Sequence, residues 1–191
     1  YLQRFVRPSD RLDVLLEKKQ IALRPRRESL ASDEILIAGT CQSHNNFHNI
    51  GNVSKYYQAV ANKIASYTNR PIAYRPNPSW YSKHNSEFRL LKNTRLSSPA
   101  TNFLDELNRT HLLVTHGSSA AFTALARGIP IMVLGNGIGR PMALSEGDWD
   151  QVNKPYFPSD EERHQFLCDV AYCQWTHEEY RSGVAWEVLR S

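Results

Sequence analysis

The fold is decided by the stretch His111-Leu-Leu-Val-Thr-His-Gly-Ser-Ser-Ala-Ala-Phe-Thr-Ala-Leu-Ala-Arg-Gly-Ile-Pro-Ile-Met-Val-Leu-Gly135. An apolar run, Leu112 to Val114, stops at a polar turn, a helix-forming segment follows to Arg127, and a second apolar run spans Ile129 to Leu134. This order predicts a strand, a tight turn, a helix and another strand. Such a unit places the helix N-terminus at the carboxyl edge of a parallel sheet, where backbone N–H groups and the helix dipole favour an anion such as phosphate.

The turn of this unit, residues 115–119, allows two interpretations. Ser118 and Ser119 either cap the helix or turn their hydroxyl groups to a ligand oxygen, and Gly117 lets a ligand approach the backbone. The helix that follows is rich in alanine and therefore narrow, so it can pack closely on a sheet. This favours the phosphate site slightly over a simple cap.

Working outward, further strands and helices alternate along the chain. Apolar runs predict strands at Ile35–Gly39 and Pro71–Arg75, with a short one at Thr94–Ser97. Apolar residues three and four apart predict an amphipathic helix over residues 53–67, and a shorter helix covers Thr101–Asn108. The alternation predicts an α/β fold, a Rossmann-like parallel sheet flanked by helices, with right-handed crossovers.

The two ends of the chain differ from this central part. We expect three segments: residues 1–30 as a basic N-terminal extension, residues 31–158 as the Rossmann-like domain, and residues 159–191 as a pair of C-terminal helices that fold back on the sheet. Ser159 is the predicted N-cap of the first helix of the pair, and Thr176 with Glu179 forms a capping box for the second.

Composition places the chain among ordinary globular proteins. It has 191 residues, of which 41% are hydrophobic and 22% charged. The apolar runs are of strand length, which predicts no membrane span, and Tyr1 is followed by no apolar leader. The three cysteines are an odd number without a CxxC pair, which indicates reduced thiols. We expect a soluble, cytoplasmic protein, processed or trimmed because it begins with Tyr.

Charge is unevenly distributed around the net value of +4. Residues 1–30 carry eight basic and four acidic side chains, residues 31–145 eleven and five, and residues 146–191 four and ten. A basic body favours polyanionic or phosphorylated ligands, although a solvated surface with an acidic helical face explains most of these charges equally well.

Ligands of an open parallel sheet bind beyond the carboxyl ends of its strands, so the loops there hold the candidate residues. Arg75 is the expected charge partner of a phosphate, unless it forms a surface salt bridge. The candidate catalytic groups are His116, Glu146 and Asp148. A satisfied turn histidine is the commoner role for His116, and the two carboxylates could equally be turn residues beside Gly147. The candidate substrate-binding residues are Gly117, Ser118, Ser119, Arg75, Asn77, Ser79, His44 and Arg140. His44 and His48 have helical spacing, but the Asn and Gly around them indicate a loop, and we expect no metal site.

The string Val114–Gly135 resembles the donor-binding half of GT-B-type glycosyltransferases, in which a Ser-Ser turn precedes a small-residue helix and a Gly-x-Pro. It is most similar to capsule-polysaccharide Kdo transferases and bacterial sialyltransferases, which pair a serine motif with a His-Pro motif around the phosphate of a CMP-activated sugar. Here Asn77-Pro78 stands at the His-Pro position, a departure that leaves His116 or Arg75 to supply positive charge. Residues 35–135 and 174–186 also resemble small proteins of tailed-phage genomes.

The resemblance implies half of a GT-B fold and a glycosyltransferase-like function. The expected partners are a nucleotide-sugar and a polysaccharide or DNA acceptor, without a cofactor. A lone donor half leaves its cleft open, so we expect a homo-oligomer or a subunit of a larger assembly, in the host cytoplasm if the protein is phage-encoded. Two alternatives remain: a non-catalytic structural or virion component, and a sugar-nucleotide epimerase or hydrolase.

Overall fold

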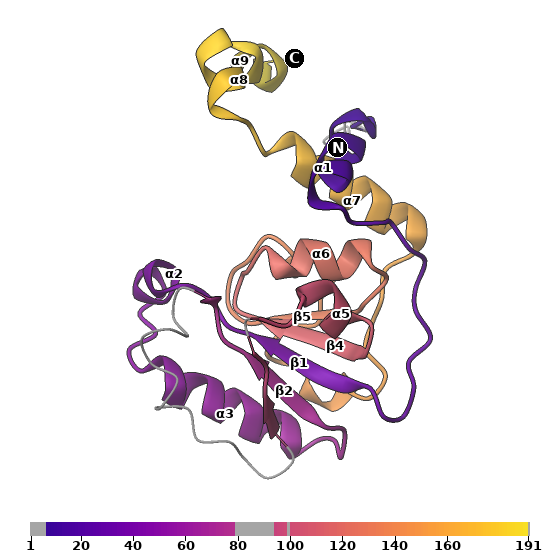
Figure 1. The fold of residues 1–191 in the computed structure, drawn as a ribbon, viewed down its shortest axis with the longest axis vertical. Coiled ribbons are helices and arrows are strands. Elements are labelled where there is room, and N and C mark those ends of the chain that lie inside the picture. The colour runs from indigo at the N-terminus through magenta and orange to yellow at the C-terminus, as the bar shows by residue number, and fades with distance from the viewer. Residues whose placement is uncertain (1–6, 79–93, 99, 191) are drawn as a thin grey trace.

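A parallel β-sheet forms the centre of the molecule. The structure is a computed structural model that describes residues 7–78, 94–98 and 100–190. In this part of the chain five strands pair in the order β3-β2-β1-β4-β5, and all of the pairings are parallel (Figure 1). The strands are β1 (Glu34–Ala38), β2 (Ile72–Arg75), β3 (Thr94–Leu96), β4 (Thr110–Thr115) and β5 (Ile131–Val133). The predicted strands and their parallel arrangement are confirmed.

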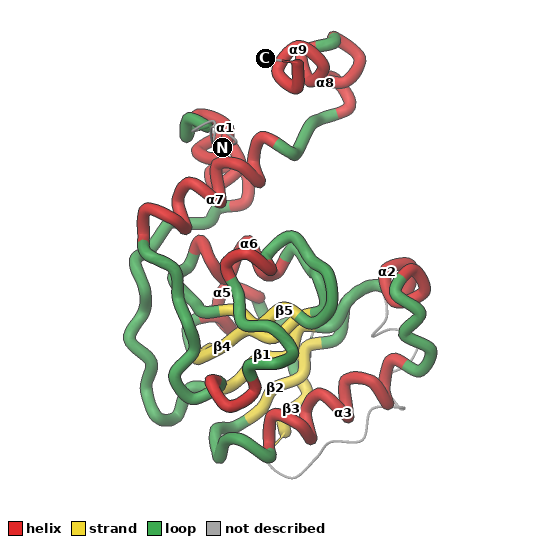
Figure 2. Tube along the Cα trace, turned by 180° about the vertical axis from the view of Figure 1, so that it is seen from behind, coloured by secondary structure: helices red, strands yellow, loops and turns green. Residues whose placement is uncertain are grey.

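Helices cover both faces of the sheet. Helix α3 lies on one face, and α5 and α6 lie on the other, with α1 and α7 packed beyond them (Figures 1 and 2). The helices are α1 (Asp10–Lys19), α2 (Gln42–Phe47), α3 (Val53–Ala65), α5 (Phe103–Leu107), α6 (Ala120–Ala126), α7 (Asp160–Tyr172), α8 (His177–Ser182) and α9 (Val184–Arg190), and two 3₁₀ turns are η1 (Arg140–Met142) and η2 (Trp149–Gln151).

The strands supply two separate cores because successive side chains in a strand point to opposite faces. In β4, Leu113 packs on the α6 side, whereas Leu112 and Val114 pack on the α3 side. Both faces of the sheet are buried, which explains why the strand segments read as continuous apolar runs.

The segment between α1 and β1 crosses the end of α6. The Arg24 amide N–H donates to the Ala126 carbonyl at 2.8 Å, and the Arg27 amide N–H donates to Gly128 at 3.0 Å. Gly128 has φ +75°, and a Cβ there would collide with the Pro25 carbonyl oxygen. Glycine at this position therefore serves both a left-handed backbone and the close approach of another segment.

The C-terminal helices depart from the expected pair that folds back on the sheet. Both predicted capping boxes are present, at Ser159 and at Thr176. The last predicted helix is divided at Gly183, which has φ +84°, and gives α8 and α9. Helix α7 packs on α1 and α6, but α8 and α9 lie beyond the α1–α7 pair, away from the sheet (Figure 1).

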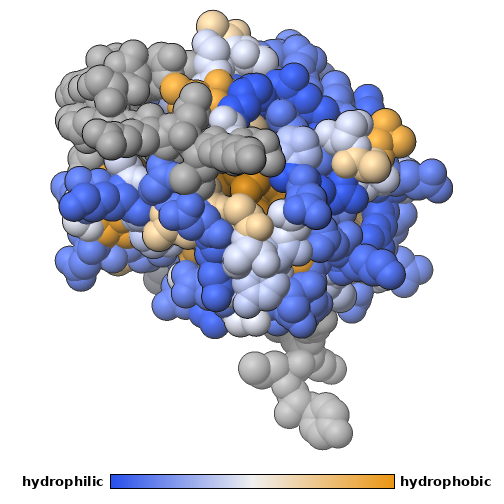
Figure 3. Space-filling view, turned by 90° about the horizontal axis from the view of Figure 1, so that it is seen from below, coloured by the Kyte–Doolittle hydropathy of each residue, from blue (hydrophilic) through white to orange (hydrophobic). Residues whose placement is uncertain are grey.

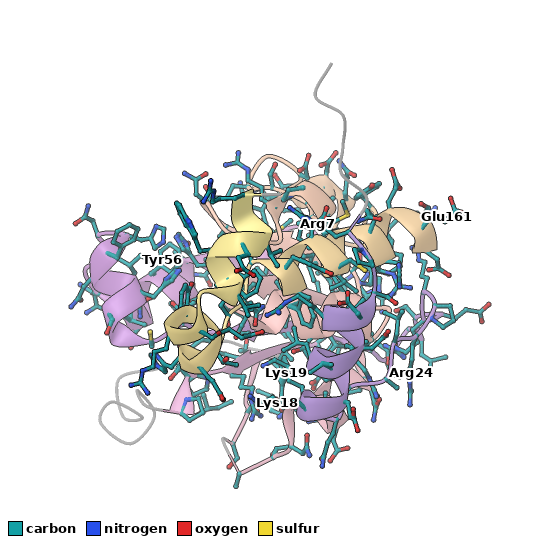
Figure 4. All side chains as sticks on the ribbon, turned by 90° about the horizontal axis from the view of Figure 1, so that it is seen from above. Arg7, Lys18, Lys19, Arg24, Tyr56 and Glu161 are labelled. Carbon is teal, nitrogen blue, oxygen red and sulfur yellow. The ribbon has the colours of Figure 1, made fainter. Side chains whose placement is uncertain are left out.

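Arg11 of α1 connects α8 to the body. Its Nη1 is 2.7 Å from Glu179 Oε1, and its guanidinium lies 4.0 Å from the centre of the Trp175 ring. Viewed from above, the labelled basic residues Lys18 and Lys19 lie on α1 and Arg24 on the segment after it, whereas Glu161 lies on the first turn of α7 (Figure 4). The basic and acidic ends of the sequence thus belong to adjacent helices.

The face on the α3 side is largely hydrophilic outside the grey atoms, and hydrophobic residues show there only in separate spots (Figure 3). No helix in the described part of the chain is both long and apolar enough to cross a membrane.

Candidate functional site

The strand order reverses at β1, which has β2 and β3 on one side and β4 and β5 on the other. Crossovers that run in opposite directions from β1 leave a crevice between the carboxyl ends of β1 and β4, and ligands of open α/β sheets bind in such a crevice. The turn after β4 and the residues at the end of β1 border it. This part of the molecule is the candidate site.

A cavity of about 230 Å³ opens at this position. Its wall combines the end of β1, the turn after β2 and the start of α6, and it includes Gly39, Arg75, Asn77, Ser118 and Ser119. Four of the predicted substrate-binding residues therefore line one cavity although they come from two distant segments of the sequence.

The two serines of the turn have different environments. The Ser118 hydroxyl accepts a hydrogen bond from the Ala120 amide at 3.2 Å, so it serves the first turn of α6. Ser119 occupies the N-cap position, but its side chain makes no capping bond, and it is exposed. Helix α6 has seven residues and ends at Arg127, its C-cap, so its dipole is that of about two turns. The Ser119 hydroxyl is therefore the more accessible of the two for a ligand.

Arg75 is held from behind by Glu106 of α5. Its Nη1 is 2.8 Å from Glu106 Oε2, and its Nη2 donates to the Thr101 carbonyl at 2.9 Å. Arg75 thus lines the cavity and also forms a salt bridge, the alternative role that its sequence position left open. An anion bound in the cavity would therefore share the Arg75 guanidinium with Glu106.

Glu106 is the centre of a larger ion-pair network. Its side chain is 1% exposed and also lies 3.3 Å from Arg95 and 3.5 Å from Arg109. Burial alone would raise its pKa, but hydrogen bonds from Ser97 and Arg75 and the charges of Arg75 and Arg95 lower it below the ordinary value. Glu106 is therefore a buried carboxylate that fixes the position of Arg75.

Gly117 is packed against protein. Its φ is +72°, and a Cβ there would lie 3.1 Å from His44 Nε2 and 3.4 Å from the Asn136 carbonyl oxygen. A Cβ on Gly137 would lie 2.6 Å from the Gly117 Cα atom. The close approach that this glycine allows in the structure is that of the 135–137 loop and of His44.

His116 lies on the opposite side of the turn from the cavity. It follows Val114 by two residues and so points to the α3 face, where it is 7% exposed. Its Nδ1 is 2.7 Å from the Tyr56 hydroxyl, and the centres of its ring and the His48 ring are 4.8 Å apart. Tyr56 belongs to α3, and in Figure 4 its label lies beside α2.

The imidazole of His116 belongs to an aromatic cluster of Tyr56, His44, His48 and His116. Burial, followed by the neighbouring charges of His48 and His44, lowers the pKa of His116 to about 4. Burial and His48 also lower the pKa of His44. A Cβ on Gly135 would lie 2.8 Å from the His116 ring, so that glycine makes room for the imidazole. His116 is thus neutral near pH 7 and supplies no positive charge to a phosphate.

The remaining candidates lie in the loop after β5. Asp148 accepts hydrogen bonds from the Ser145 amide and hydroxyl, both at 2.7 Å, which lower its pKa. Glu146 is exposed, and its charge adds to burial and to Tyr57 in raising the pKa of Tyr56. Arg140 is exposed and hydrogen-bonded to Asn136. Ser79 lies outside the described residues, and in the described part no group of histidines, cysteines and carboxylates is arranged to hold a metal ion.

Three residues that contact the candidate site residues were not recognised from the sequence. They are Glu106, which pairs with Arg75, and Tyr56 and His48, which contact His116. Glu106 sits in a predicted helix whose inward residues are apolar, and its closest partners, Arg75 and Arg95, come from other elements. Arg109, three residues further on, was the available local signal. For His48 the i to i+4 spacing with His44 was the available signal. Helix α2 occupies the segment that the neighbouring Asn and Gly residues suggested to be a loop.

No protein-family model and no curated protein matches this sequence. Among solved structures, the chain is similar to the β-Kdo 2,7-transferase of Thermosulfurimonas dismutans KpsC, with a TM-score of 0.52, 16% identity, and coverage of 84% of this chain and 50% of that one. The β-Kdo 2,4-transferase of the same KpsC has a TM-score of 0.48 and 11% identity, with coverage of 84% of this chain and 53% of that one. A putative UDP-N-acetylglucosamine 2-epimerase from Listeria monocytogenes has a TM-score of 0.45 and 17% identity, with coverage of 72% of this chain and 39% of that one.

The chain spans about half the length of these structures or less. The likeness to the 2,7-transferase, together with the parallel sheet and its strand order, shows an α/β Rossmann-like fold of the kind that forms one half of a GT-B glycosyltransferase. It shows the fold alone.

Proposed function

We propose that this chain is the nucleotide-sugar-binding half of a glycosyltransferase, and that it holds the donor phosphate in the cavity lined by Arg75, Asn77, Ser118 and Ser119. The observation that carries the proposal is the position of the cavity. It opens beside the ends of β1 and β4, where the strand order reverses and where open α/β sheets bind nucleotides. The structurally similar KpsC domain is a β-Kdo 2,7-transferase, which supports sugar transfer as the reaction class.

The chemistry of the cavity wall suits a phosphate group. The exposed Ser119 hydroxyl and the Asn77 side chain are hydrogen-bonding groups, and Arg75 brings a guanidinium that binds phosphate oxygens well. Because Glu106 already neutralises part of the Arg75 charge, the hydroxyl and backbone contacts must carry much of the binding energy. The leaving phosphate needs no metal if these groups stabilise it.

Transfer also requires an acceptor and a closed cleft. We propose that a second copy of the chain or another subunit provides this closure, and that the acceptor is a polysaccharide or DNA. None of the three candidate bases lines the cavity: Asp148 is engaged with Ser145, His116 faces the α3 side, and the charge of Glu146 reaches Tyr56 on that side. We therefore propose that the closing subunit brings the acceptor and Glu146, the exposed one of the three, together. We also propose three segments: a basic extension over residues 1–30, the nucleotide-sugar-binding domain over residues 31–158, and a C-terminal helical part over residues 159–191.

Thermal unfolding in the presence of CMP, UDP, GDP and their sugars tests the proposal. At least one nucleotide should raise the melting temperature at millimolar concentration. The double variant Ser118→Ala with Ser119→Ala should weaken binding of that nucleotide by about 1–3 kcal/mol, the loss expected for hydrogen bonds to a charged group. The matched control is Ser66→Ala, which removes an exposed hydroxyl at the end of α3. Equal affinity in the double variant and the control would contradict the proposal.

The same measurement tests a second candidate, a non-catalytic component that keeps the fold. The pairing of Arg75 with Glu106 and of Asp148 with Ser145 favours it, because both candidate groups are occupied by protein partners. Absence of any shift with all three nucleotide classes would support this candidate over the transferase.

A further inference from the structure

A second group of reactive side chains lies at the opposite edge of the sheet. His111 is the second residue of β4, whereas the turn of the candidate nucleotide site follows the last one. A cavity of about 450 Å³ opens at this amino edge, and its wall includes Arg26, Arg27, Glu28, Ser29 and His111. Nothing in the proposed function uses it.

Hydrogen bonds fix the tautomer of His111. Its Nε2 is 2.9 Å from the Val152 carbonyl oxygen, which can only accept, so Nε2 carries the hydrogen. Its Nδ1 is then the unprotonated nitrogen, and the Ser29 hydroxyl, 2.6 Å away, donates to it. The ring is 5% exposed, whereas Ser29 is exposed to solvent.

This arrangement has the geometry of an activated nucleophile. A hydroxyl within hydrogen-bonding distance of a base, and a base oriented by a third group, are the features that define serine nucleophiles on unrelated folds. Here the third group is a backbone carbonyl. Burial is the main cause that lowers the pKa of His111, so the imidazole is the neutral base that such a step requires.

The charges of the cavity suggest the substrate. Arg27 is engaged by Asp33 at 2.8 Å and by the Thr110 carbonyl at 2.6 Å, whereas Arg26 is exposed. Glu28 is exposed in the same wall and repels an anion near itself, so an anionic group of a substrate is expected beside the Arg26 guanidinium.

We propose that Ser29 and His111 form the nucleophile and base of an esterase site for small esters that carry a negative charge. This inference is independent of the proposed sugar transfer. The Ser29 oxygen attacks the ester carbonyl carbon while its proton moves to His111 Nδ1. The bond to the leaving alcohol breaks, and the alcohol oxygen takes that proton. Water then attacks the acyl-Ser29 ester, again with proton transfer through Nδ1, and releases the carboxylic acid and free Ser29.

Covalent labelling of the intact chain tests the nucleophile. A fluorophosphonate probe should phosphonylate Ser29, and peptide mass spectrometry should find the adduct there. Ser66, an exposed serine whose hydroxyl donates only to the Lys63 carbonyl among its described contacts, is the internal comparison. Absence of an adduct at Ser29, or equal labelling of Ser29 and Ser66 in the wild-type chain, would overturn the proposal.

Hydrolysis measures the substrate class. The ratio of kcat/KM for 4-acetoxybenzoate to that for phenyl acetate should fall in Arg26→Gln, because only the first ester is anionic. Ser29→Ala should lower the rate by about 100-fold or more, as loss of the nucleophile and its base-assisted step implies, while Ser66→Ala keeps it. A wild-type rate in Ser29→Ala would overturn the proposal, whether or not the variant is less stable.

Discussion

The turn after β4 serves two environments that differ in nearly every respect. Toward α6 its serine hydroxyls line an open cavity, and Arg75 of β2 adds a charged side chain to the same wall. Toward α3 it contributes the buried His116 to an aromatic cluster with Tyr56, His44 and His48, which are half-buried. Neighbouring residues of one turn therefore differ in exposure to solvent. Strand alternation places His116, a residue type that suggests chemistry, on the side away from the cavity.

The largest expected effect lies on the cavity side. Arg75→Met should lower the free energy of unfolding by about 3–5 kcal/mol, because it removes the nearest partner of a buried carboxylate. Arg95 and Arg109 stay at 3.3 and 3.5 Å and hold the loss toward the lower end. Urea unfolding measures the change, and Arg140→Met, at an exposed position, is the control. Equal stability of the two variants would show that Glu106 does not depend on Arg75.

The aromatic cluster should make stability depend on pH. The pKa of His116 is lowered from 6.5 to about 4 in the folded chain, so between these values the unfolded chain binds more protons. Stabilisation present above pH 6.5 is therefore lost as the pH falls toward 4, by up to about 3 kcal/mol.

Urea unfolding at a series of pH values measures this loss. His116→Asn should reduce the slope. The remaining slope comes from His44 and His111 and from carboxylates such as Glu106 and Glu179, whose pKa values are also lowered. The control is His177→Gln on α8. An unchanged slope in His116→Asn would mean that the imidazole is solvated in the folded chain.

A smaller effect separates the hydroxyl of Tyr56 from its ring. Tyr56→Phe keeps the ring in the cluster but leaves His116 Nδ1 without its partner at 2.7 Å. The expected loss is about 1–2 kcal/mol, the cost of an unsatisfied buried polar atom. Thermal unfolding measures the loss against the control Tyr180→Phe, at a residue that is 62% exposed. Identical melting temperatures would place a solvent molecule at Nδ1.

The smallest effect distinguishes the two serines. Ser118→Ala should cost about 0.5–1 kcal/mol because its hydroxyl accepts from the Ala120 amide, whereas Ser119→Ala should change stability by less than about 0.5 kcal/mol. Chemical denaturation of the two single variants measures both. The reverse order would assign the capping role to Ser119.

Local sequence signals predicted the parts of the fold that depend on local physics. Apolar runs located the strands, and the capping residues Ser159 and Thr176 located two helix starts. The break at Gly183 was not predicted, although a glycine with a left-handed backbone is a usual helix end. Helix α2 was missed because its Asn-rich sequence has weak helix propensity and its formation depends on packing around Asn45, which is fully buried.

The candidate site was predicted in composition more than in arrangement. Arg75, Asn77, Ser118 and Ser119 follow strand ends, and the rule that parallel strands end at one edge was enough to group them. The same rule grouped His116 with them. Only the alternation of side chains along β4, which puts His116 on the same face as Val114, separates it from the cavity. The two closest arginines of Glu106, Arg75 and Arg95, come from β2 and β3, and no local pattern reveals such long-range partners.

The crossing at Gly128 has a consequence for the natural variation of this chain. Because Pro25 lies against the place where a side chain would stand, position 128 can accept another residue only if the crossing segment moves away. The two regions, distant in the sequence, should therefore vary together among descendants of a common ancestor. Lineages that keep the crossing retain glycine, and lineages that lose it are the ones in which other residues at position 128 are expected.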